Sequence, residues 1–219
     1  MLITKDVKIR DRIFQVTISD DRQALQAAYA AGGAVVGLWG GKESEDLSPA
    51  LYLVEDLEDA DEELLRKAVC RRYHMPFEIA ETERLIIREF RASDMLPPEE
   101  KEFSSPELLS SYIACQYGFY ECGLWALAEK KTGEIVGKAG ITDGELGYEI
   151  YQKFRRKGFA EEACRAILSW AEKKNEKVCL RTHRENKASI ALACSLGFLL
   201  DKEEGEIFLF QIDLSQKEE

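Results

Sequence analysis

The sequence is short of positive charge, of histidine and of long apolar runs. Its 219 residues include 30 lysines and arginines against 41 acidic residues, a net charge of −11, and only two histidines. Broad binding to nucleic acid or to an anionic membrane needs basic surface, so neither partner is expected. No stretch approaches the ~18 apolar residues of a membrane span, and residues 1–12 lack the apolar core of a signal peptide. We therefore expect a cytoplasmic protein, whose acidity is compatible with a cationic second ligand such as an amine.

The sequence also lacks any C-x-x-C pair. Its six cysteines are Cys70, Cys115, Cys122, Cys164, Cys179 and Cys194. In an intracellular chain of this size we expect free thiols rather than disulfides. Cys70 and His74 lie four residues apart on an expected helix and could share one face, but no second pair of ligands accompanies them. We therefore expect no metal site.

What is present is the composition of a globular protein, with 45% hydrophobic and 32% charged residues. The first block, residues 1–79, predicts a small Rossmann-like βαβ domain. Asp20 and Asp21 can cap its first helix, Gly32-Gly33 ends that helix, and Pro76 stops a second one. The expected strands are 13–18, 34–39 and 51–54. Such a block is too small to bury a generous core alone, so we expect it to pack on the rest of the chain or on a second copy, which leaves a homodimer open.

The second block, residues 80–219, predicts a larger domain of the α/β (α+β) class. Its expected strands are 85–88, 123–129, 134–141, 146–151, 178–182 and 207–214. Its expected helices are 160–174 and 186–196. The polar segment 91–111 contains prolines, which indicate short helices and loops, and 216–219 reads as a disordered tail.

The most informative segment is the loop Arg155-Arg156-Lys157-Gly158-Phe159-Ala160, which joins an expected strand to an expected helix. A strand that turns through such a loop into a helix aims several backbone N–H groups at one point, and the helix dipole adds to their field. The result is an anion cradle suited to a pyrophosphate. Three consecutive basic side chains strengthen it, against the acidic background of the chain.

Four pieces of the second block occur together in one family. They are Thr82-Glu83-Arg84-Leu85-Ile86-Ile87-Arg88, Gly147-Tyr148-Glu149-Ile150, Arg155-x-x-Gly158-x-Ala160, and Asn186-x-x-Ser189 with Leu196-Gly197-Phe198. In their order and spacing they resemble the GCN5-related N-acetyltransferases (GNAT), in the branch that includes ribosomal-protein N-terminal alanine acetyltransferases. The resemblance covers roughly residues 80 to 215. It implies acetyl-CoA as cosubstrate, no metal, and a mixed, mostly antiparallel sheet that splays open after its fourth strand.

The resemblance also implies which residues hold the cofactor. Gly158 has no Cβ, so the backbone can approach phosphate oxygens closely, and Phe159 and Ala160 continue the cradle. By resemblance, Ile150 and Tyr151 flank the strand position that binds the pantetheine arm and stabilises the oxyanion. The side chains available to the phosphates of CoA, or else to solvent, are Arg155, Arg156 and Lys157.

Asn186 falls where the family often has an asparagine near the cofactor arm, and it can equally cap the following helix. Ser189 belongs to the same motif. Many relatives carry a tyrosine seven positions after this asparagine as proton donor to the leaving thiolate, but here that position is Ala193. Another residue could take the place of this tyrosine as proton donor: Ser189, Cys194 or Tyr148. His183 is expected to be structural or on the surface.

The implied reaction is direct attack of a free amine on the thioester in a ternary complex. A lysine-like amine with a pKa of ~10.4 must first lose a proton, and a carboxylate can serve as base. Glu149 is the first candidate and Glu145 the second; either can also be an ordinary exposed strand residue. The segment 97–120 is the expected acceptor wall. Its acidic residues Glu99, Glu100, Glu102 and Glu107 suit a cationic acceptor, but are expected to lie on solvated helix faces.

The first block also resembles the last part of a haloacid-dehalogenase-type phosphatase, through Ser19-Asp20-Asp21 and the run 27–37. The nucleophilic Asp-x-Asp-x-Thr segment of such enzymes is absent, so this block is expected to be non-catalytic. The leading hypothesis is an acetyl-CoA-dependent N-acetyltransferase that acts on a primary amine of a small molecule, peptide or protein N-terminus. The alternatives are an acyl-CoA-binding sensor or scaffold with little turnover and, less favoured, a phosphatase-like enzyme. The sequence does not disclose the acceptor.

Overall fold

The computed structural model describes residues 1–41, 46–173 and 177–214. The chain divides into two compact units, Met1–Phe77 and Glu78–Glu219, and each is described here by itself. Among the described residues, no helix is both long and apolar enough to cross a membrane.

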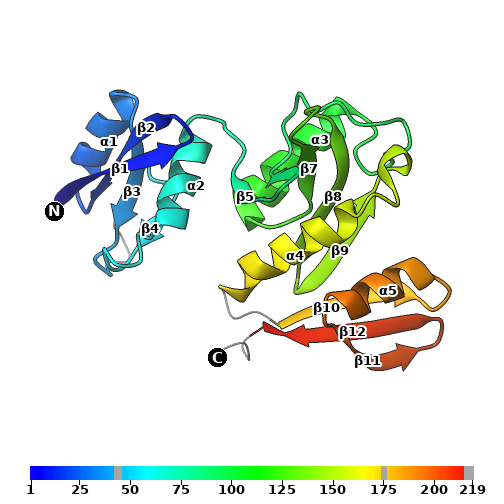
Figure 1. Ribbon diagram of the computed structural model, residues 1–219. Helices are drawn as coiled ribbons and strands as arrows, with labels where there is room; N and C mark the ends of the chain where they lie inside the picture. The colour runs from blue at the N-terminus through cyan, green and yellow to red at the C-terminus, as the bar shows by residue number, and fades with distance from the viewer. Residues whose placement is uncertain (42–45, 174–176, 215–219) are drawn as a thin grey trace. The chain divides into compact units, whose positions relative to one another are not determined.

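The N-terminal unit is a four-stranded sheet with two helices (Figure 1). In chain order its elements are β1 (Leu2–Ile9), β2 (Arg12–Ser19), α1 (Arg22–Ala30), β3 (Ala34–Leu38), β4 (Leu53–Val54) and α2 (Glu62–Arg72). The strand order is β1-β2-β3-β4, in which β1 is antiparallel to β2 and the other two pairs are parallel. The Asp21 side chain caps α1 by accepting from Gln23 N, and Asp61 caps α2 by accepting from Leu64 N.

The expected βαβ unit is present as β2, α1 and β3, but the sheet contains a strand that the sequence analysis did not predict. Residues 2–9 form β1, which pairs with β2 along its whole length from Leu2↔Ser19 to Ile9↔Arg12. The alternating charged and apolar residues of this segment fit a strand with one buried face. Because the sheet opens with an antiparallel hairpin, the Rossmann-like and haloacid-dehalogenase-like assignment of this unit is not confirmed.

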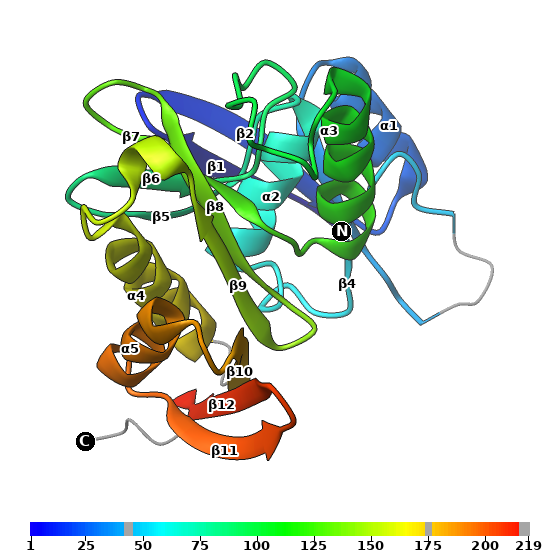
Figure 2. The same ribbon diagram turned by 90° about the vertical axis from the view of Figure 1, so that its right-hand side faces the viewer.

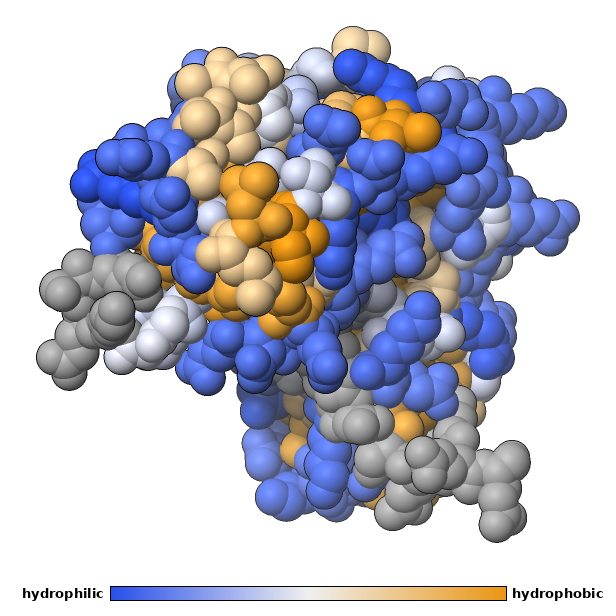
Figure 3. All heavy atoms as spheres, turned by 90° about the vertical axis from the view of Figure 1, so that its left-hand side faces the viewer, coloured by the Kyte–Doolittle hydropathy of each residue, from blue (hydrophilic) through white to orange (hydrophobic). Residues whose placement is uncertain are grey.

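The surface of the N-terminal unit is not uniformly polar. Figure 3 shows apolar side chains gathered over part of a largely hydrophilic surface. The large apolar residues that this unit leaves exposed are Met1, Leu2, Ile13, Tyr29, Leu51, Leu53 and Tyr73.

The C-terminal unit is built on an eight-stranded sheet of order β11-β12-β10-β9-β8-β7-β6-β5. Its first half contains β5 (Glu78–Glu81), β6 (Leu85–Arg88), α3 (Pro106–Tyr112), the π-helix η1 (Ile113–Tyr120), β7 (Trp125–Glu129), β8 (Ile135–Thr142) and β9 (Glu145–Ile150). Its second half contains the 3-10 turn η2 (Gln152–Phe154), α4 (Phe159–Glu172), β10 (Lys177–His183), α5 (Lys187–Ser195), β11 (Leu199–Glu204) and β12 (Ile207–Asp213).

The helices of this unit cover the two faces of the sheet separately. In Figures 1 and 2, α4 and α5 lie on one face and α3 on the other. The helix α4 buries Phe159, Ala163, Cys164, Ile167 and Ala171 against the sheet, because apolar residues recur at helical spacing on one side of it. One part of the core therefore lies between α4 and the strands β5, β8 and β9 that it contacts, and the same core continues to Leu109 of α3 and Tyr117 of η1.

The sheet opens between β9 and β10. These two strands are parallel and pair at one position, Cys179↔Glu145, where Cys179 N donates to Gly144 O at 2.8 Å. The other neighbouring pairs in this sheet are antiparallel. The mixed, mostly antiparallel sheet that splays open was predicted. The splay follows the fifth strand of the unit rather than the fourth, because the short edge strand β5 was not predicted.

Two further elements of this unit escaped the sequence analysis. β11 is exposed along its whole length, so it has no apolar alternation to mark it. The segment 113–120 forms the π-helix η1, which ends at Glu121 in the left-handed region (φ 54). The expected disordered tail, 216–219, lies outside the described residues.

Candidate functional site

A cavity of about 560 Å³ lies where β9, the loop 152–158, the start of α4 and α5 meet. It brings together nine of the residues expected at the site, from three segments of the chain. They are Glu149, Ile150, Arg155, Arg156, Gly158, Phe159, Ala160, Asn186 and Ser189. Three others, Glu145, Tyr151 and Lys157, do not line it.

The start of α4 forms one wall of this cavity. Its N-cap is Gly158, in the left-handed region (φ 80), and no side chain caps the helix there. The N–H groups of the first helical turn have no acceptor within the helix, and Phe159 and Ala160 line the cavity. Arg156 also takes a positive φ (62°), so the loop turns sharply before the helix. The backbone thus presents a bare, positively polarised helix end to the cavity.

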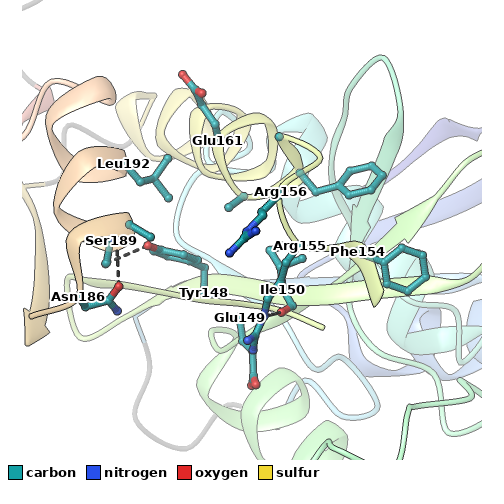
Figure 4. Close-up of a pocket in the computed structure, with 14 residues that line it drawn as sticks. Tyr148, Glu149, Ile150, Phe154, Arg155, Arg156, Glu161, Asn186, Ser189 and Leu192 are labelled. Carbon is teal, nitrogen blue, oxygen red and sulfur yellow. Dashed lines mark hydrogen bonds between the residues drawn. The ribbon is translucent and has the colours of Figure 1, made fainter. Parts of the chain in front are cut away.

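The three basic side chains of the loop take different places. Figure 4 shows Arg156 directed into the cavity. Arg155 lines it as well, and its Nε donates to Ile150 O at 2.8 Å. The Lys157 ammonium lies 5.3 Å from the centre of the Phe154 ring, and Lys157 is not among the residues that line the cavity. The two arginines are therefore the cationic side chains available to an anion here.

The wall formed by β9 has an open backbone edge. Tyr151 N donates to Val136 O at 3.0 Å, toward β8. Because successive residues of an antiparallel strand direct their backbone groups to alternate edges, Tyr148 and Ile150 direct theirs toward β10. Beyond Glu145, that edge has no ladder partner among the described strands. A ligand in the splay therefore meets the main chain of Tyr148 and the N–H of Ile150, whose C=O accepts from Arg155 Nε. The main-chain N–H of Tyr151 is bonded to β8 instead.

The third wall is the start of α5. Asn186 caps this helix, since its Oδ1 accepts from Ser189 N at 3.2 Å, and it also lines the cavity; both roles left open for it are thus compatible. The Tyr148 hydroxyl donates to Ser189 Oγ at 2.9 Å across the cavity (Figure 4). Burial raises the pKa of Tyr148. Ala193 is fully buried and Cys194 is exposed, so Tyr148 and Ser189 are the hydroxyls that reach the cavity from this side.

The opposite face of β9 holds a buried charged cluster that the sequence analysis did not predict. The Lys138 ammonium lies 2.9 Å from Glu100 Oε1, 2.5 Å from Glu102 Oε2 and 3.7 Å from Glu149 Oε2. The Tyr151 hydroxyl donates to Glu100 Oε2 at 2.8 Å. We call these five residues the Lys138 cluster. A lysine in the otherwise apolar run 135–141 was the signal that could have revealed it.

The Lys138 cluster is stabilised by mutual hydrogen bonding. Burial alone would raise the pKa of Glu100, but hydrogen bonds from Lys138 and Tyr151 outweigh it, so this pKa lies below its usual range. Burial alone would lower the pKa of Lys138, and its two carboxylate partners raise it instead. Glu100 was expected on a solvated helix face, which is wrong: it is 4% exposed.

A second cavity, of about 400 Å³, lies along the same side of β9 and is lined by Glu145 and Gly147 together with Glu102, Tyr112 and Gln116. Burial raises the pKa of Tyr112 to about 12. The side chain of Glu145 stands 3.7 Å from Arg181 Nη1. Part of this wall comes from α3 and η1, within the segment 97–120 that was expected to face the acceptor.

Two histidine-containing features contribute no candidate site. His183 Nε2 lies 3.0 Å from Glu206 Oε2 on the surface, outside the cavity. Cys70 is buried and donates to Pro76 O, while His74 follows α2 in the left-handed region (φ 52). Within the described ranges, no group of three His, Cys, Asp or Glu side chains is placed to hold a metal ion.

Residues 53–199, well over half of the chain, match the family described as the acetyltransferase (GNAT) domain. The chain belongs to the GNAT acetyltransferase family. The fold and the family expected from the four motifs are thus confirmed. The matched range begins at residue 53, within the N-terminal unit.

Two curated relatives come from Bacillus subtilis (strain 168). The uncharacterized protein YkkB is 33% identical over 93 residues, which cover 38% of this chain and 54% of YkkB. The uncharacterized N-acetyltransferase YjdG is 28% identical over 91 residues, which cover 37% of this chain and 54% of YjdG. The chain thus spans about half the length of these curated relatives.

Solved structures show the same fold. The ribosomal-protein-S5-alanine acetyltransferase from Vibrio fischeri matches with a TM-score of 0.54 at 17% sequence identity, over 66% of this chain and 100% of that chain. At this identity the likeness establishes the GNAT fold, and it places a ribosomal-protein acetyltransferase among the structural neighbours.

Proposed function

We propose that the protein transfers an acetyl group from acetyl-CoA to a primary amine by direct attack in a ternary complex. The observation that carries this proposal is the 560 Å³ cavity, which joins a bare helix N-terminus to an open strand edge. The first suits a diphosphate and the second suits an amide-containing arm. Acetyl-CoA has both, separated along one chain, and the GNAT family uses acetyl-CoA as cosubstrate.

In this proposal the main chain does most of the cofactor recognition. The N–H groups of Phe159 and Ala160 face the diphosphate, and Arg156 and Arg155 add positive charge beside it. The pantetheine arm lies in the splay against Tyr148 and Ile150. One N–H on that edge of β9 stabilises the oxyanion that forms when the amine attacks the thioester carbon.

Glu149 is the better placed of the two candidate bases. It lines the cofactor cavity next to Ile150, and Figure 4 shows its side chain on the other side of β9 from Arg156. Glu145 lies four residues earlier, or roughly 13 Å along a strand, where it stands beside Arg181. Glu149 removes a proton from the ammonium group of the acceptor, directly or through water, and the free amine then attacks the thioester carbon. The Tyr148 and Ser189 hydroxyls stand on the cofactor side and can return a proton to the leaving thiolate.

The acceptor approaches over the face of β9 that carries the 400 Å³ cavity. Glu102 and Glu145 line this cavity and Glu149 lies beyond it on the same face of β9, so its polarity suits the ammonium form in which an amine arrives at neutral pH. This supports an amine acceptor on a small molecule, a peptide or a protein N-terminus. The ribosomal-protein acetyltransferase among the structural neighbours is one reason to include protein N-termini in a screen.

We further propose that residues 1–79 form an accessory domain with no part in the chemistry. The residues that line the cofactor cavity all come from the span 148–192. The acids Asp20 and Asp21, which suggested a phosphatase, are engaged locally: Asp21 caps α1, and Asp20 pairs with the N-terminal ammonium group.

The test is calorimetric titration with acetyl-CoA, followed by thiol release over a panel of amines and peptide N-termini. Wild type is expected to bind acetyl-CoA and to release CoA with at least one amine. Gly158→Asp should abolish binding, because Asp places a negative charge at the diphosphate position and a Cβ at a positive φ. Gly133→Asp is the matched control, since Gly133 also has a positive φ (74°) with open space around it, in the β7–β8 turn.

Unchanged affinity in Gly158→Asp would contradict the proposed cofactor site. Binding without thiol release across the whole panel would favour the alternative of an acyl-CoA sensor or scaffold. Phosphatase activity that is lost in Asp20→Asn would favour the alternative of a phosphatase-like enzyme.

A further inference from the structure

The carboxylate of Glu162, on the first turns of α4, is surrounded by donors from the segment that precedes β6. Its Oε1 accepts from Thr82 Oγ1 at 2.6 Å and from Arg84 N at 2.9 Å. Its Oε2 accepts from Arg84 Nε at 2.6 Å and lies 2.5 Å from Arg84 Nη2. The side chain of Glu162 is 17% exposed. Two segments 78 residues apart are thus joined at one carboxylate.

The segment that supplies these donors is itself held in shape. Thr82 N donates to Leu85 O at 2.9 Å, and Leu85 N donates back to Thr82 Oγ1 at 2.9 Å. The turn 82–85 is therefore closed on itself before β6 begins. This closure directs the Arg84 side chain toward the start of α4. It gives the threonine and the arginine of the motif a structural role, since Thr82 closes the turn and Arg84 reaches the helix.

Arg84 reaches beyond Glu162 into the loop that precedes the helix. Its Nη1 donates to Lys157 O at 2.8 Å, and its guanidinium carbon lies 4.5 Å from the centre of the Phe159 ring. In a planar trans peptide the C=O and the following N–H point in opposite directions. Because Arg84 holds the Lys157 carbonyl, the N–H of Gly158 points away from Arg84, and Gly158 lines the cavity.

Arg84 also offsets an unfavourable charge. Glu162 lies within the first two turns of α4, and a carboxylate there opposes the binding of an anion at the helix N-terminus. The guanidinium is planar and matches the carboxylate with two parallel donors. The pair therefore fixes the loop and offsets the charge of Glu162, while Glu161 of the same turn, which lines the cavity, pairs with Arg165 at 2.7 Å.

We propose that Arg84, fixed by Glu162 and Thr82, is a positioning residue that sets the Lys157–Gly158 peptide for the diphosphate of the cofactor. The inference rests on the proposed function, since it assigns a task within the acetyl-CoA site. Arg84 acts through the loop backbone and makes no contact with the reacting atoms.

The experiment compares two ligands that differ in the diphosphate. Acetyl-CoA carries it, and S-acetyl-pantetheine lacks the diphosphate and the nucleotide. The dissociation constants are measured by calorimetry for acetyl-CoA and by NMR titration for S-acetyl-pantetheine. Arg84→Met is expected to weaken acetyl-CoA by roughly ten- to a hundredfold, the usual range for losing hydrogen bonds of a charged group, and to leave S-acetyl-pantetheine within about twofold.

Two further variants separate geometry from charge. Arg84→Lys keeps the charge without the fork, so its loss of acetyl-CoA affinity should fall between wild type and Arg84→Met. Arg84→Met combined with Glu162→Gln removes the unpaired carboxylate, and it should bind acetyl-CoA more tightly than Arg84→Met alone.

The matched control is Arg88→Met, in the same motif. Arg88 makes the same kind of fork, to Asp94 at 2.7 and 2.8 Å, but is buried at the far end of β6. It should lower the melting temperature at least as much as Arg84→Met while acetyl-CoA affinity per folded molecule stays unchanged.

The outcomes are distinguishable. Failure of wild type to bind acetyl-CoA would overturn the proposed function itself. If wild type binds and Gly158→Asp does not, but Arg84→Met equals wild type, the cofactor site stands and the positioning inference falls. Equal losses for both ligands in Arg84→Met would also overturn it, because a general disturbance of the fold would then explain the effect.

Discussion

The two faces of β9 are built from different materials. On the side of α4 and α5, the cavity combines the uncapped start of α4 with apolar side chains, two arginines and the Tyr148–Ser189 hydroxyl pair. On the other side, the Lys138 cluster packs one lysine against three carboxylates. The first face suits a ligand that is the same compound in every reaction cycle. The second can be altered one side chain at a time, which suits the partner that differs between members of a family.

The largest expected effect comes from a substitution in the Lys138 cluster, on the face of β9 that is built from charged side chains. Lys138→Met leaves the buried Glu100 without its cationic partner, and removing one partner of a buried pair typically costs roughly 3–5 kcal/mol. Chemical denaturation should show this loss in the free energy of unfolding. Lys153→Met is the control, because Lys153 forms an exposed pair with Glu134 and such pairs contribute about 0–1 kcal/mol. A loss in Lys138→Met no larger than in the control would show that the cluster is not a stabilising unit.

The next effect falls on catalysis. Glu149→Gln should lower kcat by about a hundredfold, within the usual range for removing a general base. It should leave the affinity for acetyl-CoA nearly unchanged, since the proposed cofactor contacts lie on the side of Arg156 and the Glu149 side chain lies on the other side of β9. Steady-state thiol release with an active amine measures the first, and calorimetry the second. The kcat of Glu149→Gln should recover as pH rises, because more of the amine is then already deprotonated. If Glu145→Gln lowers kcat more than Glu149→Gln does, the order of the two candidates is reversed.

The smallest expected effect is on acid stability, and both faces contribute to it. Burial alone would raise the pKa of Glu162, but hydrogen bonds from Thr82 and Arg84 outweigh it and lower this pKa; the pKa of Glu100 is lowered in the same way. A carboxyl group with a lowered folded-state pKa stabilises the protein above its unfolded pKa of about 4.3, and this contribution is lost as pH falls through the folded-state pKa.

The free energy of unfolding should therefore fall as the pH is lowered below about 4. Glu162→Gln and Glu100→Gln should each make that decline shallower, whereas Glu58→Gln, at an exposed position, should not. Parallel acid limbs in wild type and both variants would rule out the two carboxylates as its source.

The face of β9 toward α4 and α5 was largely predictable from sequence, and the face that carries the Lys138 cluster was not. An uncapped helix start after a glycine depends on neighbouring residues alone, so the loop from Arg155 to Ala160 could be predicted from its own sequence. The meeting of Lys138 with Glu100 depends on how the segment before α3 folds back over β8, which no local pattern encodes. For the same reason Thr82 and Arg84 were recognised as part of a motif while their contact with Glu162 was not.

The strands that were missed follow the same rule. β5 is only four residues long and β11 is exposed throughout, so neither has the alternation of buried and exposed residues that marks a strand. β1 does alternate, but its charged residues were interpreted only as evidence against a signal peptide. For β5 and β11, pairing with a neighbouring strand, rather than local preference, determines the conformation.

The single backbone pairing between β9 and β10 has a mechanical consequence. Few backbone hydrogen bonds therefore join the two parts of the sheet. A ligand arm bonded to the free edge of β9 would add hydrogen bonds where β10 makes none. Occupancy by substrate would then stiffen the protein along that line, and amide hydrogens on both strands would exchange more slowly with solvent. While it is bound, the cosubstrate would thus help to hold the two parts of the sheet together.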